Sequence, residues 1–314
     1  MPYINVDEAY ILDNTGLQVD QVADIPYTDA ALTDTQKAQA RKNIAAGGTN
    51  PNLLDNPFFQ VNQRSAVSIT GSSSGTPSVD RWLLFGSGST TDLTVTANGV
   101  SVHSATNGFA QRMPSDLGDF LDGKTVTLSV MDTSGEVASG SLVYDKTTLK
   151  NTGQLTIGSY TCAIYAGKSG NFQLVSITTG ANTIPLRAAK LELGTVSTLA
   201  NDTPPNYADE LLKCNRARWQ SNGTYICLAS AVSTTQAIAV INLPTQMFNT
   251  PSVVRSGAFA LSDRVNAGIA VTDITTMTAD KQTLALLITA SGLTNNRTYA
   301  LTTSDGWIAA SADL

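Results

Sequence analysis

LTVTANGVSVHS, residues 93–104, is the stretch that decides the fold. Apolar and polar side chains alternate both before and after its central pair, Asn98-Gly99. Asn-Gly between two alternating runs is typical of a β-hairpin with a two-residue turn, because both residues tolerate positive φ. We therefore expect two adjacent antiparallel strands here, with their apolar side chains on one face of a sheet.

The same alternation covers the residues around this hairpin. It recurs, with turn residues between the runs, at 124–132, 141–149, 154–167, 172–180 and 183–194. The last run is expected to form a pair of strands. About seven short strands with no helix between them are typical of a sandwich or a jelly roll. We expect an all-β chain with a jelly-roll-like β-sandwich at residues 51–200.

A short helix is expected before the sandwich, within an N-terminal segment of residues 1–50. The sequence LTDTQKAQARKNIAAGG at 32–48 begins with a capping box formed by Thr33 and Gln36, and it ends at two glycines. Its apolar side chains are few, so an isolated helix of this kind is unstable in water. We expect it to need a partner surface.

A linker and a second helix follow the sandwich. The two prolines of NDTPPN cannot take part in a sheet ladder, and Asn206 can cap a helix that runs from Tyr207 to about Gln220. Strand-like runs then return. We expect residues 201–220 to form the linker and helix, and residues 221–314 to form a smaller C-terminal β domain.

Composition excludes several classes of function. Only 14% of residues are charged, the net charge is -6, and the sequence has no cluster of Lys and Arg that could neutralise a nucleic-acid backbone. Its apolar runs are much shorter than the roughly 18 residues that a membrane helix needs. The acidic N-terminus lacks the basic start and apolar middle of a secretory signal. We expect no nucleic-acid binding, no membrane insertion, and synthesis in a cytoplasm.

The sequence predicts no catalytic site. The single histidine, His103, lies mid-strand on the polar face, so a catalytic triad lacks a base. Cys162, Cys214 and Cys227 are isolated and cannot complete a zinc site without further ligands. We expect a non-enzymatic protein without a cofactor, and we leave open a structural calcium ion held by Asp, Asn and backbone oxygens. A polysaccharide-degrading enzyme is the remaining catalytic alternative, although no pair of carboxylates stands out.

Aromatic side chains in the C-terminal domain are the candidates for ligand binding. Trp307 follows the turn sequence Ser304-Asp305-Gly306, which favours a position near the surface. Tyr299 and Tyr225 lie in strand-like runs of the same domain. Rings of this kind can stack on the apolar faces of sugars. We therefore expect these three residues to contact a ligand.

Three segments resemble proteins of phage tails. LTDTQKAQARKNI at 32–44 is similar to a helical connector near the front of tail-fibre proteins. NLLDNPFFQVNQRS at 52–65, with SVDRW at 78–82, resembles the opening of a β-sandwich module, and AAKLELGTVSTLANDTPPNYADELLKCNRARWQ at 188–220 resembles its end. The family departs from this chain at 215–218, where it has paired aromatics. The resemblance implies a carbohydrate-binding-module-like sandwich in a virion protein, usually a homotrimer.

A function follows from this resemblance: a phage tail-fibre or receptor-binding component, located in the virion. We expect copies of the chain to meet at Ile44, Tyr207, Leu211 and Leu212, because the helices that carry them have narrow apolar faces. Residues 1–50 would bind other tail or baseplate proteins, and the C-terminal domain would bind a glycan or protein of the host surface. The alternative is an architectural collar or baseplate protein without a ligand of its own.

Overall fold

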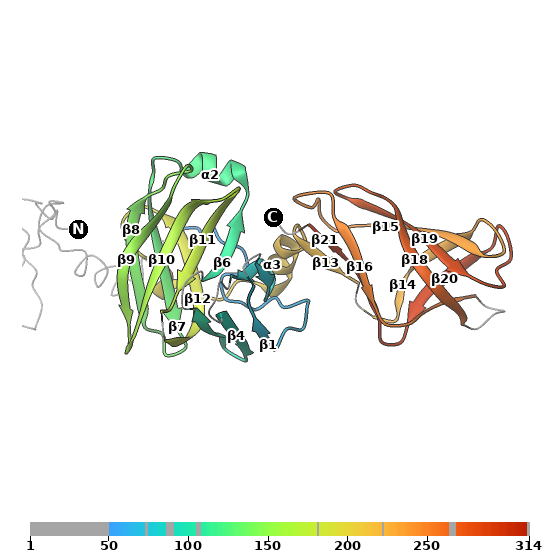
Figure 1. Ribbon diagram of the computed structural model, residues 1–314, viewed down its shortest axis with the longest axis horizontal. Coiled ribbons are helices and arrows are strands. Elements are labelled where there is room, and N and C mark those ends of the chain that lie inside the picture. The colour runs from blue at the N-terminus through green and yellow to red at the C-terminus, as the bar shows by residue number, and fades with distance from the viewer. Residues whose placement is uncertain are drawn as a thin grey trace, which may run out of the picture. The chain divides into compact units, whose positions relative to one another are not determined.

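The computed structural model of the protein (Figure 1) describes residues 50–72, 75–85, 91–104, 108–180, 182–221, 223–263 and 268–312. The chain divides into two compact units, Met1–Gly48 and Thr49–Leu314. The first unit lies outside the described residues, and with it the helix expected at 32–48, the contact residue Ile44 and almost all of the expected attachment segment. The second unit is built mostly from β-strands, which confirms the all-β class.

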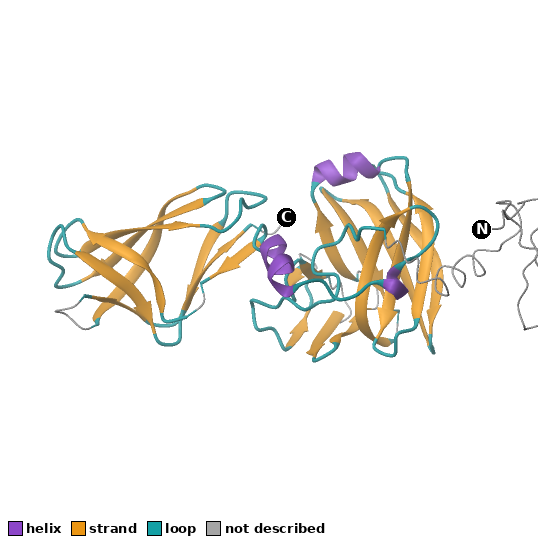
Figure 2. Cartoon of the chain, turned by 180° about the vertical axis from the view of Figure 1, so that it is seen from behind, coloured by secondary structure: helices purple, strands orange, loops and turns teal. Residues whose placement is uncertain are grey.

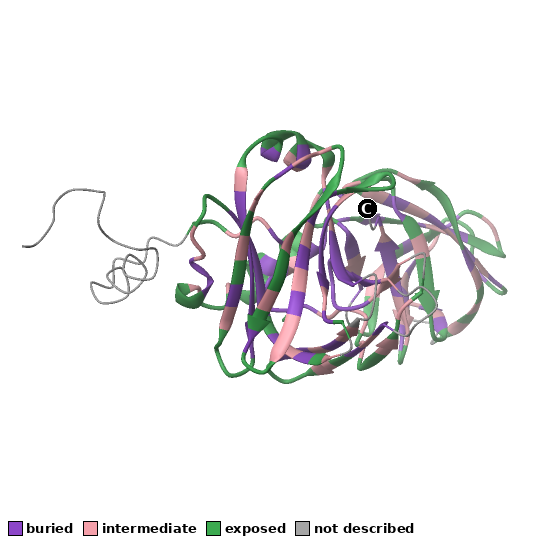
Figure 3. Ribbon diagram, turned by 60° about the vertical axis from the view of Figure 1, so that its left-hand side comes forward, coloured by how far each residue is buried: buried purple, intermediate pink, exposed green. Residues whose placement is uncertain are grey.

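Two six-stranded antiparallel sheets form a β-sandwich (Figures 1 and 2). The first has the order β1 (Ser68–Thr70), β4 (Thr91–Thr96), β5 (Gly99–Ser104), β12 (Thr183–Leu193), β7 (Thr125–Asp132) and β8 (Val137–Val143). The second has the order β2 (Thr76–Pro77), β3 (Trp82–Leu84), β6 (Phe109–Met113), β11 (Phe172–Thr178), β10 (Tyr160–Ser169) and β9 (Leu149–Ile157). Side chains from both sheets share one hydrophobic core, and buried and exposed residues alternate along many strands (Figure 3).

The hairpin predicted from Asn98-Gly99 is present, but its two-residue turn is Ala97-Asn98, because Gly99 already pairs with Thr96 as the first residue of β5. Strands β4 and β5 are antiparallel neighbours, with Val95 opposite Val100. Gly99 has a φ of +135°, and a Cβ at this position would lie 2.1 Å from the carbonyl oxygen of Leu186 in β12. Only glycine fits so close to the neighbouring backbone. Gly99 therefore follows the turn directly and permits the close contact with the next strand.

The helices differ in part from those expected. Helix α2 (Ser115–Leu121), between β6 and β7, was not predicted. Helix α3 (Tyr207–Cys214) begins where expected, and the side chain of Asn206 caps it by accepting a hydrogen bond from the backbone of Ala208 at 2.8 Å. The helix ends at Cys214 instead of near Gln220, because the chain enters strand β13 (Arg218–Gln220).

The run at 183–194 also differs from expectation. It forms one strand, β12, and not a pair. Leu186 pairs with Asp132 and Ala188 with Met131, so Arg187 is an extra residue in the ladder, a β-bulge. A short 3-10 helix (Leu199–Asn201) follows the strand.

The strands after α3 form a closed barrel with a small sheet (Figure 1). The barrel order is β14 (Tyr225–Ala231), β15 (Gln236–Asn242), β19 (Thr283–Ala290), β18 (Ile269–Ala279), β17 (Phe259–Ser262) and β20 (Thr298–Thr303). The small sheet has the order β13, β21 (Trp307–Ser311) and β16 (Ser252–Ser256). A separate hydrophobic core fills the barrel. Just after β21, the backbone N–H of Ala312 donates to the carbonyl of Ala217 at 2.7 Å, which joins the end of the chain to the segment after α3.

Candidate functional site

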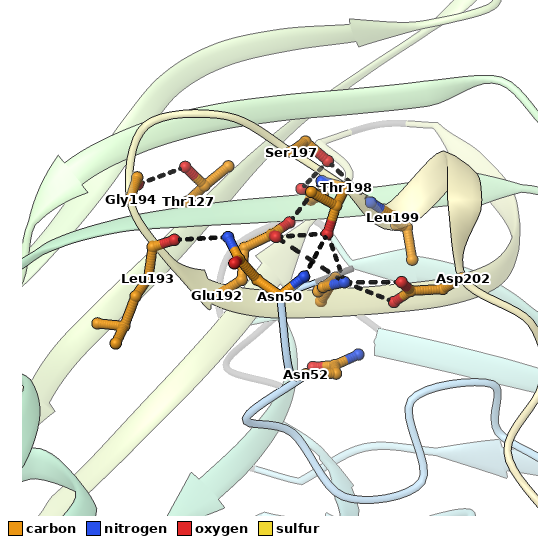
Figure 4. Close-up of polar contacts among 12 residues, drawn as sticks. Asn50, Asn52, Thr127, Glu192, Leu193, Gly194, Ser197, Thr198, Leu199 and Asp202 are labelled. Carbon is orange, nitrogen blue, oxygen red and sulfur yellow. Dashed lines mark hydrogen bonds and ion pairs between the residues drawn. The ribbon is translucent and has the colours of Figure 1, made fainter. Parts of the chain in front are cut away.

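A buried ionic network lies at the end of β12 (Figure 4). The side chain of Lys190 is 0% exposed, and its Nζ donates to Oδ1 and Oδ2 of Asp202 at 2.7 and 2.8 Å and to Oγ1 of Thr198 at 2.8 Å. The carboxylate of Glu192 accepts from the backbone and the hydroxyl of Thr198 at 2.8 and 2.6 Å, and its Oε2 lies 3.8 Å from Nζ. The ammonium group therefore faces acceptors in all three directions in which it can donate. This geometry suits a structural anchor.

The start of the sandwich is tied to the same network (Figure 4). The backbone N–H of Asn50 donates to Oγ1 of Thr198 at 3.3 Å, and its Nδ2 donates to the carbonyl of Leu193 at 3.0 Å. Nearby, Nδ2 of Asn52 donates to the carbonyl of Ala189 at 2.9 Å. The segment that begins the sandwich domain in the sequence and the segment that ends it are thereby held side by side.

A second buried network attaches helix α3 to the sandwich. The backbone N–H of Asn56 donates to Oε1 of Glu210 at 2.5 Å, while its side chain bonds to the backbones of Val61 and Asp80 at 2.8–3.0 Å. The carbonyl oxygen of Asn56 accepts the indole N–H of Trp82 at 3.1 Å. Asn56 has a φ of +50°, a conformation that asparagine adopts more readily than most residues. The inner face of the helix is therefore fixed by hydrogen bonds through Glu210.

Asp80 and Arg81 extend this second network. The carboxylate of Asp80 accepts from the backbone N–H of Gln63 at 2.5 Å. Arg81 donates from Nε to Oδ2 of Asp55 at 2.9 Å, and its guanidinium carbon lies 4.7 Å from the ring centroid of Phe248. Asp55, Asn56, Gln63, Asp80 and Arg81, which lie in the segments NLLDNPFFQVNQRS and SVDRW, are thus engaged in internal contacts that sequence reasoning did not predict.

Two large apolar side chains of α3 are exposed, beside the exposed charged residues Asp209 and Lys213. Tyr207 is 54% exposed and Leu212 is 46% exposed, whereas Glu210 and Cys214 are the buried residues of the helix. Leu211 is half-buried. Of the four residues expected to meet other copies of the chain, the structure thus places Tyr207 and Leu212 on the surface of the protomer. Within the described part of the chain, both side chains are far more exposed to solvent than the side chains of the hydrophobic cores.

The three aromatic residues expected to bind a ligand have different surroundings. Tyr225, in β14, is 53% exposed. Trp307, in β21, is half-buried, and the guanidinium carbon of Arg218 lies 5.3 Å from its ring centroid. Tyr299 is only 1% exposed, and its hydroxyl accepts the backbone N–H of Thr294 at 2.9 Å. Its ring belongs to the barrel core and presents no face to a ligand, so the prediction for this residue finds no support.

An open groove lies on the sandwich. Its volume is about 600 Å³. The residues that line it come from the first turn of the sandwich, the β4–β5 hairpin, the bulge of β12 and the start of α3: Phe58, Phe59, Gln60, Asn62, Val95, Thr96, Ala97, Asn98, Gly99, Arg187, Pro204, Pro205 and Tyr207. Sequence reasoning missed this groove, because its residues meet only after the sheets have formed. The Asn98-Gly99 turn is the single local signal that marks it.

The cysteines are protected by burial. Desolvation raises the pKa of both Cys162 and Cys227 to about 11. Desolvation, followed by the negative charges of Asp80, Asp55 and Glu210, raises the pKa of Cys214 still further. Thiols of this kind are poor nucleophiles at neutral pH.

Within the residues that the structure describes, no three His, Cys, Asp or Glu side chains gather as a group that could hold a metal ion. In the same residues, no helix is long and apolar enough to cross a bilayer.

Comparison with known proteins gives no family for this chain. No family model, no curated protein and no solved structure matches it. The resemblance to phage tail proteins consequently depends on the three sequence segments described above.

Proposed function

We propose that this chain is a structural protein of a phage tail, a trimeric tail-fibre or receptor-binding component that contacts the host cell surface. The sequence resemblance suggests this class. The observation that carries the proposal is Leu212, a leucine that is exposed on a helix whose inner face is anchored through Glu210. Residues 1–50 would attach the protein to the tail, and the C-terminal barrel would lie toward the host.

The sandwich holds helix α3 at a fixed position, and the helix carries Leu212 on its exposed side. A helix of eight residues is too short to be stable by itself, and its place here depends on the contact of Glu210 with Asn56. The position of Leu212 is therefore set before any partner arrives. Apolar side chains held at a fixed position lose little further freedom on association. Three copies around one axis would cover Leu212 in each chain, whereas Tyr207, five residues earlier and about 140° away around the helix, would stay open to solvent.

Sedimentation velocity of the full chain at micromolar concentration tests the assembly. We expect the unchanged protein to sediment as a trimer and Leu212→Asp to sediment as a smaller species. Leu228→Asp is the matched control, because Leu228 is an exposed leucine on barrel strand β14; it should remain trimeric. A clean monomer of the unchanged protein would refute the trimer. Equal effects of the two substitutions would refute the assignment to α3.

The place of the protein in the virion needs a separate measurement. A density map of the assembled particle, with antibody fragments bound to the chain, should place it in the tail with the barrel toward the outside. Its absence from the tail would contradict the proposal. A glycan array probed with the intact protein then distinguishes the two versions of the function. A silent array from a trimer that is present in the tail would favour the architectural collar or baseplate protein.

A further inference from the structure

The groove on the sandwich is built by two backbone features that bring polar side chains together. The bulge in β12 inserts Arg187 into the ladder, and bulges re-aim the side chains that they carry. The β4–β5 turn presses against the same point, because a Cβ on Gly99 would lie 3.0 Å from Cα of Arg187. Asn98, at the tip of the turn, and Arg187 therefore line one groove.

The polar side chains of the groove have unused hydrogen-bonding capacity. Gln60, Asn98 and Arg187 are exposed. Within the described ranges, the side chains of these three residues make no hydrogen bond or ion pair with another residue. Arg187 is the one charged residue among those that line the groove. The side chain of Asn62, in contrast, is engaged with the backbone of Ala66 at 2.8 and 2.9 Å. The groove thus offers two amides and one guanidinium to a ligand.

Other residues that line the groove are rigid and apolar. Tyr207 contributes an exposed ring, and Pro204 and Pro205 precede it in the segment that enters α3. Proline has a fixed φ, and the ring of a tyrosine has few rotatable bonds, so this surface loses little entropy when it is covered. A flat ring that lines the same groove as amide groups matches a molecule with apolar C–H faces and hydroxyl edges.

We propose that this groove binds an acidic saccharide, with the ring of Tyr207 against a sugar face, the amides of Gln60 and Asn98 on hydroxyl groups, and Arg187 on a carboxylate. A guanidinium without an internal partner binds a carboxylate in a bidentate manner. A nucleic-acid backbone would require several cations, and this groove has one. The inference depends on the function proposed above, because it names the surface through which the protein would hold a host glycan.

Binding by the intact protein tests this inference. An array of neutral, uronic-acid and sialic-acid glycans should give signals with the acidic members, and calorimetry with a hexuronate disaccharide and its neutral counterpart should show the same preference. Arg187→Gln should weaken binding of the acidic disaccharide about tenfold or more, since a hydrogen bond to a charged group is lost. Lys168→Gln is the matched control, because Lys168 is an exposed cation on strand β10; it should bind as the unchanged protein does.

A second pair of variants separates this groove from the barrel. Tyr207→Ala should abolish stacking in the groove, whereas Tyr225→Ala removes a ring of nearly equal exposure on β14. The inference is overturned if Tyr225→Ala alone reduces binding, if Arg187→Gln and Lys168→Gln are equivalent, or if only neutral glycans bind. A silent array also overturns it. The assignment to a trimeric tail protein would survive any of these results, because sedimentation and the particle map decide it independently, and a silent array would change only the part that concerns a host ligand. Sedimentation of each variant shows whether its assembly is unchanged.

Discussion

Replacement of Lys190 by methionine should destabilise the sandwich strongly. The ammonium group is fully buried, makes two hydrogen bonds to Asp202 and one to Thr198, and lies 3.8 Å from Glu192. Methionine fills most of the volume but leaves two carboxylates without their cation, one of them completely buried. Loss of one partner from a buried ion pair costs about 3–5 kcal/mol. For a body of this size, such a loss lowers Tm by on the order of 10 °C.

Urea unfolding followed by circular dichroism, together with differential scanning calorimetry, measures this loss. Lys146→Met is the matched control, because Lys146 also faces two carboxylates, Asp119 at 3.1 Å and Asp122 at 3.7 Å, but lies on the surface. Exposed ion pairs are worth about 1 kcal/mol or less. A cost for Lys190→Met that is no larger than that for Lys146→Met would refute the view that the network is sealed from water and supports the fold.

Three further predictions concern stability. Gly99→Ala should lower the free energy of unfolding by about 2 kcal/mol or more in a urea titration, because its Cβ would lie 2.1 Å from the carbonyl oxygen of Leu186. Gly135→Ala should lower it by about 1 kcal/mol, from its positive φ alone, because its Cβ would meet nothing within 4 Å. Equal losses for the two variants would contradict this explanation. Glu210→Ala should lower the free energy of unfolding by about 1–3 kcal/mol, since the buried N–H of Asn56 loses its acceptor. Glu210→Gln keeps an acceptor and should lower it less. A larger loss for Glu210→Gln than for Glu210→Ala would exclude Glu210 as the acceptor that anchors the helix. The free energy of unfolding should fall as the pH rises from 9 to 11, because folding raises the pKa of Cys162 and Cys227 from 9.0 to about 11, so the unfolded chain releases protons that the folded chain retains. The double variant Cys162→Ala, Cys227→Ala should show a shallower fall in the same titration, and an unchanged slope would contradict the assignment.

Local features of this fold could be predicted from the sequence. The Asn98-Gly99 hairpin and the Asn206 cap depend on residues close to one another in the chain, so their patterns are complete within a few positions. The alternation of apolar and polar side chains likewise identified most strands of the sandwich and of the barrel. The end of α3 was predicted too late, because Trp219 fits a helical apolar pattern but pairs in the sheet with Ala310, far along the chain.

The buried networks could not be predicted from patterns. Asn50 donates to Thr198 across 148 positions, and Asn56 donates to Glu210 across 154. In the sequence these are ordinary polar residues, and nothing in their spacing shows that they meet. The bulge at Arg187 is hidden for a related reason, because it exists only relative to the pairing partner β7. The candidate groove depends on that bulge and was missed with it.

The distribution of charge and apolar surface links these observations. The chain has few charged residues, and several of them, among them Lys190, Glu192, Arg81 and Glu210, are buried where the segments of the fold join. Buried charges require fixed partners, since an unpaired one is costly, and they therefore define how those segments fit together. Leucine and tyrosine side chains remain outside, at Leu212, Tyr207 and Tyr225. A surface of low charge produces less repulsion between copies of a protein than a strongly charged one, as the assembly proposed above requires.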